Sequence, residues 1–529
     1  MSTSKQPSVM KHLFSMAPRA KLPRSSFDRT SGHKTTFNAG KLVPMYLDEV
    51  LPGDSYNMKQ TGFLRMATPV YPIMDNLYID TFWFFVPNRL TQSSWVNLMG
   101  ERDNPDDSID FQVAKISNTG FEVTEGDVGD HFGLPLGTYA NTRISALPFR
   151  GLSLIWNEWF RDQNLQNSRT FSKTDTDSTY SDYSELPDRG KRHDYFTSCL
   201  PWPQKGDDVT MPLGSTAPII GLGDNGEYFR TDGPSDVRED TLFYTNSDPS
   251  PRWSGGSVSG NSEAQLFMAA DLSNATAATI NTMRLAITTQ QFLEQEARSG
   301  SRYTELNQSF FGVINPDSRL QRPELLAVHS TPVRAEAVSA SATLIADPSW
   351  AGSALGDVGA VMTGQWTSGF TKSFVEHGYL FGLISVRGDL NYQQGVDRHW
   401  SRTDRFDFYF PNFAHLGEQA VLNKEIYHQD STEDDDVFGY NEVWSEYKYK
   451  TSQITGEFRS TAAQPLDAWH LAQEFTTLPL LDDTFIKENP PMDRVIVTED
   501  EPDFICDMYN KLKCARVMPV YSVPGLNRF

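Results

Sequence analysis

The run YIDTFWFFVPNRL, residues 78–90, constrains the fold of this chain most strongly. It has four aromatic side chains in succession at 82–85 and ends its apolar stretch at Pro87. The run is too short for a membrane helix, which needs about 20 apolar residues. Because successive side chains of a strand point to opposite faces, a strand here is apolar on both. We therefore expect a central strand covered on both faces, rather than an exposed stacking platform, and proline terminates it.

Short apolar runs separated by Pro, Gly, Asn and Asp continue from residue 41 onward. This punctuation is typical of many short strands joined by turns, as in a sandwich or barrel. Residues 374–392 and 405–417 are also strand-like in composition. Apolar positions at helical spacing predict two longer helices, at 147–164 and 281–300. The sequence thus predicts a mainly β protein with a few helices.

The net charge of −22 is unevenly distributed along the chain. Residues 1–41 are rich in lysine and arginine, with Asp28 as their one acid, and no acid follows Asp507 at the basic C-terminal end. Clusters of lysine and arginine bind polyanions by displacing counterions from phosphates. Solvated tails would have the same composition, so charge alone leaves both interpretations open.

Motifs that would indicate catalysis or metal binding are weak. GLGDNG, at 221–226, matches a dinucleotide fingerprint but is not followed by the helix that would meet the pyrophosphate. Asp175 and Asp177 begin a calcium-loop pattern that lacks its glycine and its last acid, which leaves only weak surface calcium binding open. Cys199 follows His193 by six residues and is interpreted as a packed thiol. No pattern singles out a pair of glycosidase carboxylates.

The cysteine content, the N-terminal segment and the length of the apolar runs indicate the cellular compartment. The three cysteines do not suggest a disulfide framework and fit a reducing compartment. The N-terminal segment is charged and lacks an apolar centre, so we expect no secretory signal. No apolar run is long enough to predict a membrane span.

Seven stretches of the sequence are informative when they are taken together, in the order in which they occur along the chain. They are SSFDRTSGHKTTFNAGKLVPMYLDEVLPGDSYNMK, YIDTFWFFVPNRL, ALPFRGLSLIWNEWFRDQNLQ, GKRHDYFTSCLPWPQKG, ARSGSRYTELNQSFFGVINPDSRLQRPELL, RTDRFDFYFPNFAHLGEQAVLNKEIY and MPVYSVPGLNRF. Together they resemble the major capsid protein of the Microviridae, of the gokushovirus type, from about residue 25 to the C-terminus. Residues 207–275 fall outside the shared stretches.

The resemblance implies a mainly β fold, an eight-stranded antiparallel viral jelly roll with long loop insertions and a few helices. It implies a homo-oligomer of sixty copies, a T=1 icosahedral shell around a circular single-stranded DNA genome, assembled in the cytoplasm of a host bacterium. The expected partners are a DNA pilot protein, a small internal or scaffolding protein and a bacterial surface receptor. It implies no enzymatic activity and no cofactor.

The domain organisation follows from composition and resemblance together. Residues 1–40 are expected to form a basic N-terminal arm, and 506–529 a basic extended C-terminal tail. Residues 41–206 and 276–505 are expected to form the two parts of the jelly roll. Residues 207–275, rich in Ser, Thr, Asp, Gly and Pro, are expected to form a surface insertion that builds the three-fold protrusion.

Two sets of side chains are the candidate functional residues. The basic ends would contact DNA by neutralising phosphates, although each cation could instead pair with an acid of a neighbouring subunit. The insertion would contact the host surface. The DNA-binding candidates are Lys5, Lys11, Arg19, Lys21, Arg24, Arg29, Lys34, Lys511, Lys513, Arg516 and Arg528, and the host-attachment candidates are Asp224, Tyr228, Arg230, Tyr244 and Trp253.

Two other functions compete with a capsid protein. A secreted, aromatic-rich all-β carbohydrate-active enzyme would need a signal peptide and a carboxylate pair in a cleft. A monomeric single-stranded DNA-binding protein would place its stacking aromatics among its lysines. The densest aromatic run here lies instead in an apolar strand.

Overall fold

The computed structural model describes residues 23–521 with several gaps. The chain forms two compact units, one of Met1–Pro203 with Ser299–Phe529 and one of Gln204–Arg298. The expected insertion, 207–275, falls within the second unit. The residues between 23 and 521 that the structure does not describe are 109, 117–119, 211–218, 223–227, 230–241, 246–247, 254–266, 271–279, 340–357 and 499–500.

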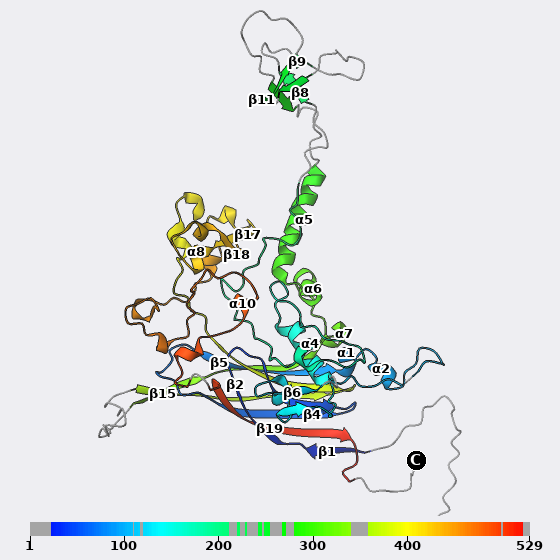
Figure 1. Cartoon of the computed structure of the whole chain (residues 1–529). Helices are drawn as coiled ribbons and strands as arrows, with labels where there is room; N and C mark the ends of the chain where they lie inside the picture. The colour runs from blue at the N-terminus through cyan, green and yellow to red at the C-terminus, as the bar shows by residue number, and fades with distance from the viewer. Residues whose placement is uncertain are drawn as a thin grey trace, which may run out of the picture. The chain divides into compact units, whose positions relative to one another are not determined.

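Two antiparallel sheets form the body of the first unit and lie in stacked layers (Figure 1). In the six-stranded sheet, β1 and β2 pair with successive parts of one edge of β19, whose other edge is followed by β4, β15 and β14. The four-stranded sheet has the order β13-β5-β16-β3. The strands are β1 (Arg24–Asp28), β2 (Ser31–Phe37), β3 (Val43–Val50), β4 (Ser55–Met66), β5 (Leu77–Pro87), β13 (Glu324–Pro332), β14 (Arg334–Ser339), β15 (Val358–Ser373), β16 (Gly378–Gly388) and β19 (Phe504–Val517).

The chain alternates between the sheets as a jelly roll requires. Strands β2 and β4 lie in the six-stranded sheet, whereas β3 and β5 lie in the other. Later in the chain β15 and β19 join the six-stranded sheet and β13 and β16 the four-stranded one. The predicted mainly β jelly roll is therefore confirmed. The expected count of eight strands is not confirmed, since the two sheets have six and four described strands. Among them, β1 pairs with the edge of β19 and β14 continues from β13 into the six-stranded sheet.

The aromatic part of the run at 78–90 is a central strand that ends at Pro87, as predicted, and α1 (Asn88–Thr91) follows it directly. Strand β5 is hydrogen-bonded to β13 on one edge and to β16 on the other. Trp83 and Phe85 point into the core between the two sheets. Phe82 and Phe84 point to the opposite face, where they pack on the helical layer that contains Phe160, with ring centroids 5.0 and 5.9 Å away.

The core between the sheets also contains a buried polar network. The Gln60 side-chain oxygen accepts hydrogen bonds from the Trp366 indole (3.2 Å) and the Ser368 hydroxyl (3.3 Å). The Ser368 hydroxyl in turn accepts one from the Trp83 indole of the other sheet (3.2 Å), and the Gln60 amide donates to Asn510 at 2.8 Å. Because buried polar groups cost stability when unpaired, this network fixes how the sheets face each other.

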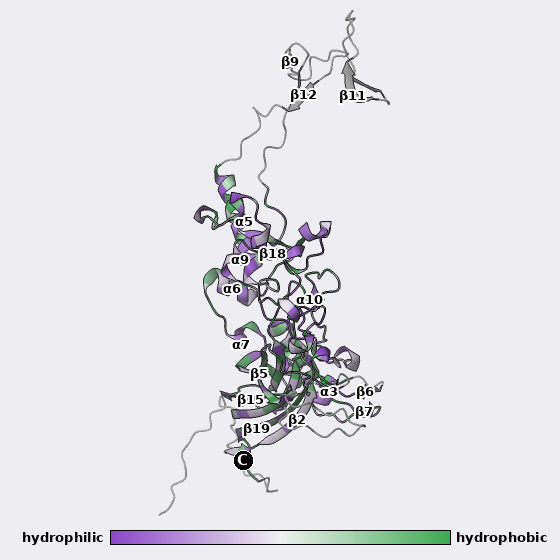
Figure 2. Ribbon diagram, turned by 90° about the vertical axis from the view of Figure 1, so that its left-hand side faces the viewer, coloured by the Kyte–Doolittle hydropathy of each residue, from purple (hydrophilic) through white to green (hydrophobic). Residues whose placement is uncertain are grey.

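Hydrophobic residues gather where the sheets stack, as the green ribbon around β5 and β15 in Figure 2 shows. Helices cover the far face of the four-stranded sheet. The helix predicted at 147–164 is α4 (Leu147–Ile155) with a π-helical turn at Trp156–Phe160. The helix predicted at 281–300 is α5 (Ile280–Ser299), which belongs almost wholly to the second unit.

Shorter elements complete the described chain. In the first unit they are α1 (Asn88–Thr91), α2 (Trp95–Leu98), β6 (Phe121–Val123), α3 (Val128–His131), β7 (Gly137–Tyr139), α6 (Tyr303–Phe311), α7 (Asp317–Leu320), β17 (Glu418–Leu422), α8 (Asn423–Ile426), β18 (Val437–Glu442), α9 (Ser445–Lys448) and α10 (Asp483–Ile486). In the second they are β8 (Ile219–Leu222), β9 (Tyr228–Phe229), β10 (Leu242–Thr245), β11 (Asp248–Trp253) and β12 (Phe267–Ala270).

The strand expected at 405–417 is wrong. Residues Arg405–Asp407 and Pro411–Phe413 form 3-10 turns, and neither joins a sheet. The Asp407 carboxylate accepts the backbone N–H groups of Thr403 and Asp404, both at 2.8 Å, which curls the chain locally. Side-chain capture of backbone N–H groups competes with strand pairing, and proline supplies no N–H to a sheet.

Candidate nucleic-acid interface

The six-stranded sheet has one buried and one open face. Along β19 the side chains alternate between buried and exposed from Phe504 to Cys514, and β4 does the same from Tyr56 to Met66. Because the side chains of a strand alternate between its faces, the exposed set forms one continuous surface. We call this surface the open sheet face, and in Figure 1 it belongs to the layer of β19 and β4, on the side away from α4.

Cations face one another across the strands of the open sheet face. Lys511 of β19 lies directly opposite Lys59 of β4 in the ladder. Like charges directly opposite destabilise a strand pair, and a bound anion would remove that repulsion. Arg65 and Lys513 lie on the same face, two strand positions or more from this pair.

Most of these cations are not neutralised by the chain itself. Lys34 has an exposed partner in Asp507, at 3.8 Å. Hydrogen bonds from Thr30, and to a smaller extent the charges of Lys511 and Lys513, lower the pKa of the Asp28 carboxyl. Within the described part of the chain, Lys59, Arg65, Lys511 and Lys513 form no ion pair with a carboxylate within 4.0 Å. The face is therefore cationic on a strongly acidic protein.

Two aromatic side chains lie among these cations. Phe63 of β4 is 43 % exposed and Tyr509 of β19 is 55 % exposed. Both line a shallow hollow of about 980 Å³ that Lys34 also lines. Exposed rings beside lysines are the arrangement on which single-stranded nucleic acid binds, with bases on the rings and phosphates on the ammonium groups.

The structure places five of the predicted DNA-binding residues in strands of this sheet, and four of them are exposed, the fifth being Arg516 of β19. The exposed four are Arg24 of β1, Lys34 of β2, and Lys511 and Lys513 of β19. Residues 24–28 and 31–37 of the expected arm thus lie in β1 and β2, and residues 506–517 of the expected tail lie in β19.

Two other candidates are ion-paired within the subunit. The Arg29 guanidinium donates to Asp48 at 2.8 Å, and Arg516 donates to the buried Asp54 at 2.9 Å and to the Tyr56 hydroxyl at 2.6 Å. These contacts anchor the corner of the sheet, so Arg29 and Arg516 are less available to phosphate than the open lysines. The remaining candidates, Lys5, Lys11, Arg19, Lys21 and Arg528, lie outside the described residues.

The host-attachment candidates are only partly placed. Tyr228, Tyr244 and Trp253 are residues of strands β9, β10 and β11, respectively. Asp224 and Arg230 lie outside the described residues. These assignments therefore stay predictions.

Sequence reasoning missed Lys59, Phe63, Arg65 and Tyr509. The signal was present in two stretches that alternate apolar with polar or charged side chains, 55–66 and 504–514. Recognising them as adjacent strands requires the pairing, since the two stretches are more than 400 residues apart and lie side by side only in the folded sheet.

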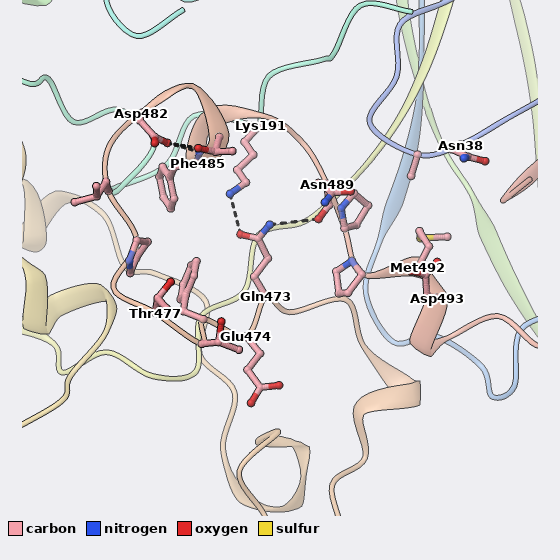
Figure 3. A pocket seen from close by; sticks show the side chains of 18 of the residues that line it. Asn38, Lys191, Gln473, Glu474, Thr477, Asp482, Phe485, Asn489, Met492 and Asp493 are labelled. Atoms are coloured by element: carbon pink, nitrogen blue, oxygen red, sulfur yellow. Dashed lines mark hydrogen bonds between the residues drawn. The ribbon is translucent and has the colours of Figure 1, made fainter. Parts of the chain in front are cut away.

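A second hollow, of about 770 Å³, lies beside α10 (Figure 3). The buried Lys191 donates to the Gln473 side-chain oxygen at 2.8 Å and lies over the Phe485 ring at 4.2 Å. Its ammonium group is thus part of the wall and is not directed at open space.

Two of the sites considered from sequence, a metal centre and Cys199, can be examined in the described residues. No group of three or more His, Cys, Asp or Glu side chains there could hold a metal ion. Cys199 is a buried free thiol whose Sγ contacts the Tyr195 carbonyl, and burial raises its pKa, as a packed thiol requires. No described helix is both long and apolar enough to cross a membrane.

Comparison with known proteins identifies the family. A sequence profile described as "Capsid protein (F protein)" matches residues 15–526. The chain is 42 % identical to the capsid protein VP1 of Bdellovibrio phage phiMH2K, over 97 % of both proteins. It is 40 % identical to the capsid protein VP1 of Chlamydia phage 1, over 99 % of both, and 33 % identical to that of Spiroplasma virus 4, over 98 % of both. The chain therefore belongs to the capsid protein (F protein) family of the Microviridae, as a structural protein of the virion with gokushovirus-type relatives.

Proposed function

We propose that this major capsid protein self-assembles into an icosahedral shell of sixty copies around circular single-stranded DNA. The open sheet face is directed at the genome, and the insertion at 207–275 contacts the surface of the host bacterium. A DNA pilot protein and a small internal or scaffolding protein complete the virion. The proposal is supported by the three relatives, each of which is named capsid protein VP1.

The observation that supports the DNA-facing role best is the pair of opposed lysines beside exposed rings. Lys59 and Lys511 repel each other across the ladder, and a phosphate bound to each ammonium group would offset that repulsion. Phe63 and Tyr509 offer surfaces on which any base can stack. Such contacts neutralise phosphates without reading sequence, as a shell that packages a whole genome requires.

The lysine pair can be tested by the salt dependence of DNA binding. The Lys59→Gln, Lys511→Gln double variant removes two phosphate contacts from each copy. Because each phosphate contact with single-stranded DNA contributes about −0.7 to the slope of log affinity against log salt, we expect the slope to become shallower by about 1.4. Binding of a fluorescent single-stranded oligonucleotide to dissociated subunits at several salt concentrations measures it.

Lys450→Gln is the matched control, because this exposed lysine lies outside the six-stranded sheet. It should leave the slope unchanged. If the double variant has the same salt slope as the parent chain, Lys59 and Lys511 do not contact DNA and the open sheet face has no role in DNA binding.

A further inference from the structure

The segment between β16 and β17 exposes five aromatic side chains within residues 400–410. Trp400 is 75 % exposed, Phe406 58 %, Phe408 49 %, and Tyr409 and Phe410 46 % each. We call these five side chains the ring surface. Large exposed apolar patches on a soluble protein mark sites of interaction, whereas single exposed rings need no explanation.

The ring surface has a fixed local shape. Phe406 and Phe410 each pack edge-on against Phe413, with centroids 6.1 and 6.5 Å apart. Tyr409 packs edge-on against the buried Trp444 at 5.7 Å. Phe406, Tyr409 and Phe410 are thus held by other rings of the same subunit, so they lose little conformational freedom when a partner covers them.

Two arginines support the rings from the same segment. The Arg405 guanidinium lies over the Phe406 ring at 4.6 Å. Arg402 lies over the Phe408 ring at 5.4 Å and pairs with Glu446 at 3.2 Å. Aromatic residues and arginine are the types most enriched at the energetic centres of protein–protein interfaces.

The size of the ring surface suits one side of such an interface. Five aromatic side chains of about 150–250 Å² each, roughly half exposed, present on the order of 500 Å². That is near the upper end of the largest patch on an ordinary monomer, about 300–600 Å². It would fill the centre of the roughly 800 Å² that each partner contributes to a standard interface.

The same unit carries a second apolar set on and after α6. Tyr303 is 71 % exposed, and Phe311 and Ile314 are 77 % exposed. A contact between unlike surfaces of identical copies needs two different surfaces on every copy, and it builds a closed cyclic assembly when the rotation between copies closes. The chain therefore offers both halves of a contact with itself.

We propose that the ring surface is a contact between neighbouring copies of this chain in the shell. The inference rests on the proposed self-assembly and assigns residues to it. In the assembled particle the five rings are covered by the adjacent copy, and in dissociated subunits they face water. Apolar burial at this contact stabilises the shell rather than the subunit.

Oxidative footprinting of Trp400 and Phe406 tests the proposal directly, in particles made from this chain alone and in subunits dissociated from them. Both rings should be labelled in subunits and protected in particles, while Trp83, buried in the subunit core, stays unlabelled in both. Equal labelling of Trp400 in particles and subunits would overturn the inference. Protection in both states would also overturn it, because the chain itself would then cover the rings.

Substitution adds an energetic measure. Trp400→Ser and Phe406→Ser should each weaken assembly by about tenfold or more, as loss of a central interface ring does, with the unfolding midpoint of the subunit unchanged. Leu480→Ser is the control, since Leu480 is 67 % exposed and lies outside both apolar sets. Parent-like assembly of both ring variants would contradict the proposal. Failure of the parent chain to form any particle would instead contradict the proposed function.

Discussion

Lys191 is a buried cation whose pKa is changed by the fold. Its side chain is buried beside the Phe485 ring, with Gln473 as its hydrogen-bond acceptor (Figure 3). Burial lowers its pKa to about 8, although the charges of Glu488 and Asp194 work in the opposite direction. The folded chain therefore binds this proton less tightly than the unfolded chain, whose lysine has a pKa near 10.4.

This difference predicts how stability changes with pH. Between pH about 8 and about 10.4 the unfolded chain holds more protons at Lys191, so the contribution of this residue to stability rises across that window. The full effect corresponds to about 3 kcal/mol. In urea unfolding of the subunit, the parent should gain stability relative to Lys191→Met as pH rises from 8 to 10. Lys450→Met should follow the parent, and a pH-independent difference between the parent and Lys191→Met would contradict the altered pKa.

At the scale of elements, the pairing of β4 with β15 depends on a missing side chain. Gly62 lies directly opposite Trp366 in the ladder between the two strands. The Trp366 side chain points into the core between the sheets, and position 62 lies on the same, buried face of β4. A Cβ at position 62 would stand 2.1 Å from the Trp366 ring. The indole thus packs on the bare backbone of β4, and from there it donates to Gln60.

Gly62→Ala should therefore destabilise the subunit by about 1–3 kcal/mol, as overpacking of a core does. The reason is that Trp366 must move, which also breaks its hydrogen bond to Gln60. Gly32→Ala in β2 is the matched control, because a Cβ there meets nothing closer than 3.8 Å. Urea denaturation of both variants measures the difference, and equal stabilities would show that the ring has room to shift.

Local pattern predicted some elements and not others. The run at 78–90 was predictable because its length, its apolar faces and Pro87 all indicate one buried strand. The rings at 405–417 suggested a strand by the same composition, yet Asp407 and Pro411 turn the chain and leave the rings exposed. Composition records that rings are present, whereas which of them are buried depends on residues that lie far apart in sequence.

The candidate site was predictable only in part, for the same reason. The basic C-terminal end of the sequence indicates Lys511 and Lys513 as cations. It does not show which side chains lie beside them in the fold. Lys59 and Phe63 belong to the acidic body of the chain, and only the ladder between β4 and β19 places them beside those lysines. The sequence does not reveal that Arg516 is ion-paired within the subunit, because its partner Asp54 is 462 residues away.

At the scale of the whole molecule, the chain separates three roles. The core between the sheets, with its buried network around Gln60, holds the subunit together. The open sheet face gathers cations on a protein of net charge −22, and the ring surface gathers apolar side chains on the same unit. A shell protein needs such a division, because one surface must meet the genome and another must meet the neighbouring copies.

The most direct test of this account is the reactivity of Lys59 and Lys511 toward an acetylating reagent small enough to enter the shell. It is measured in particles that contain DNA and in empty particles of the same chain, with Lys450 as the reference lysine. If the open sheet face meets the genome, both lysines react much more slowly in DNA-filled particles than in empty ones, while Lys450 reacts equally in both. Equal rates for Lys59 and Lys511 in filled and empty particles would contradict this account.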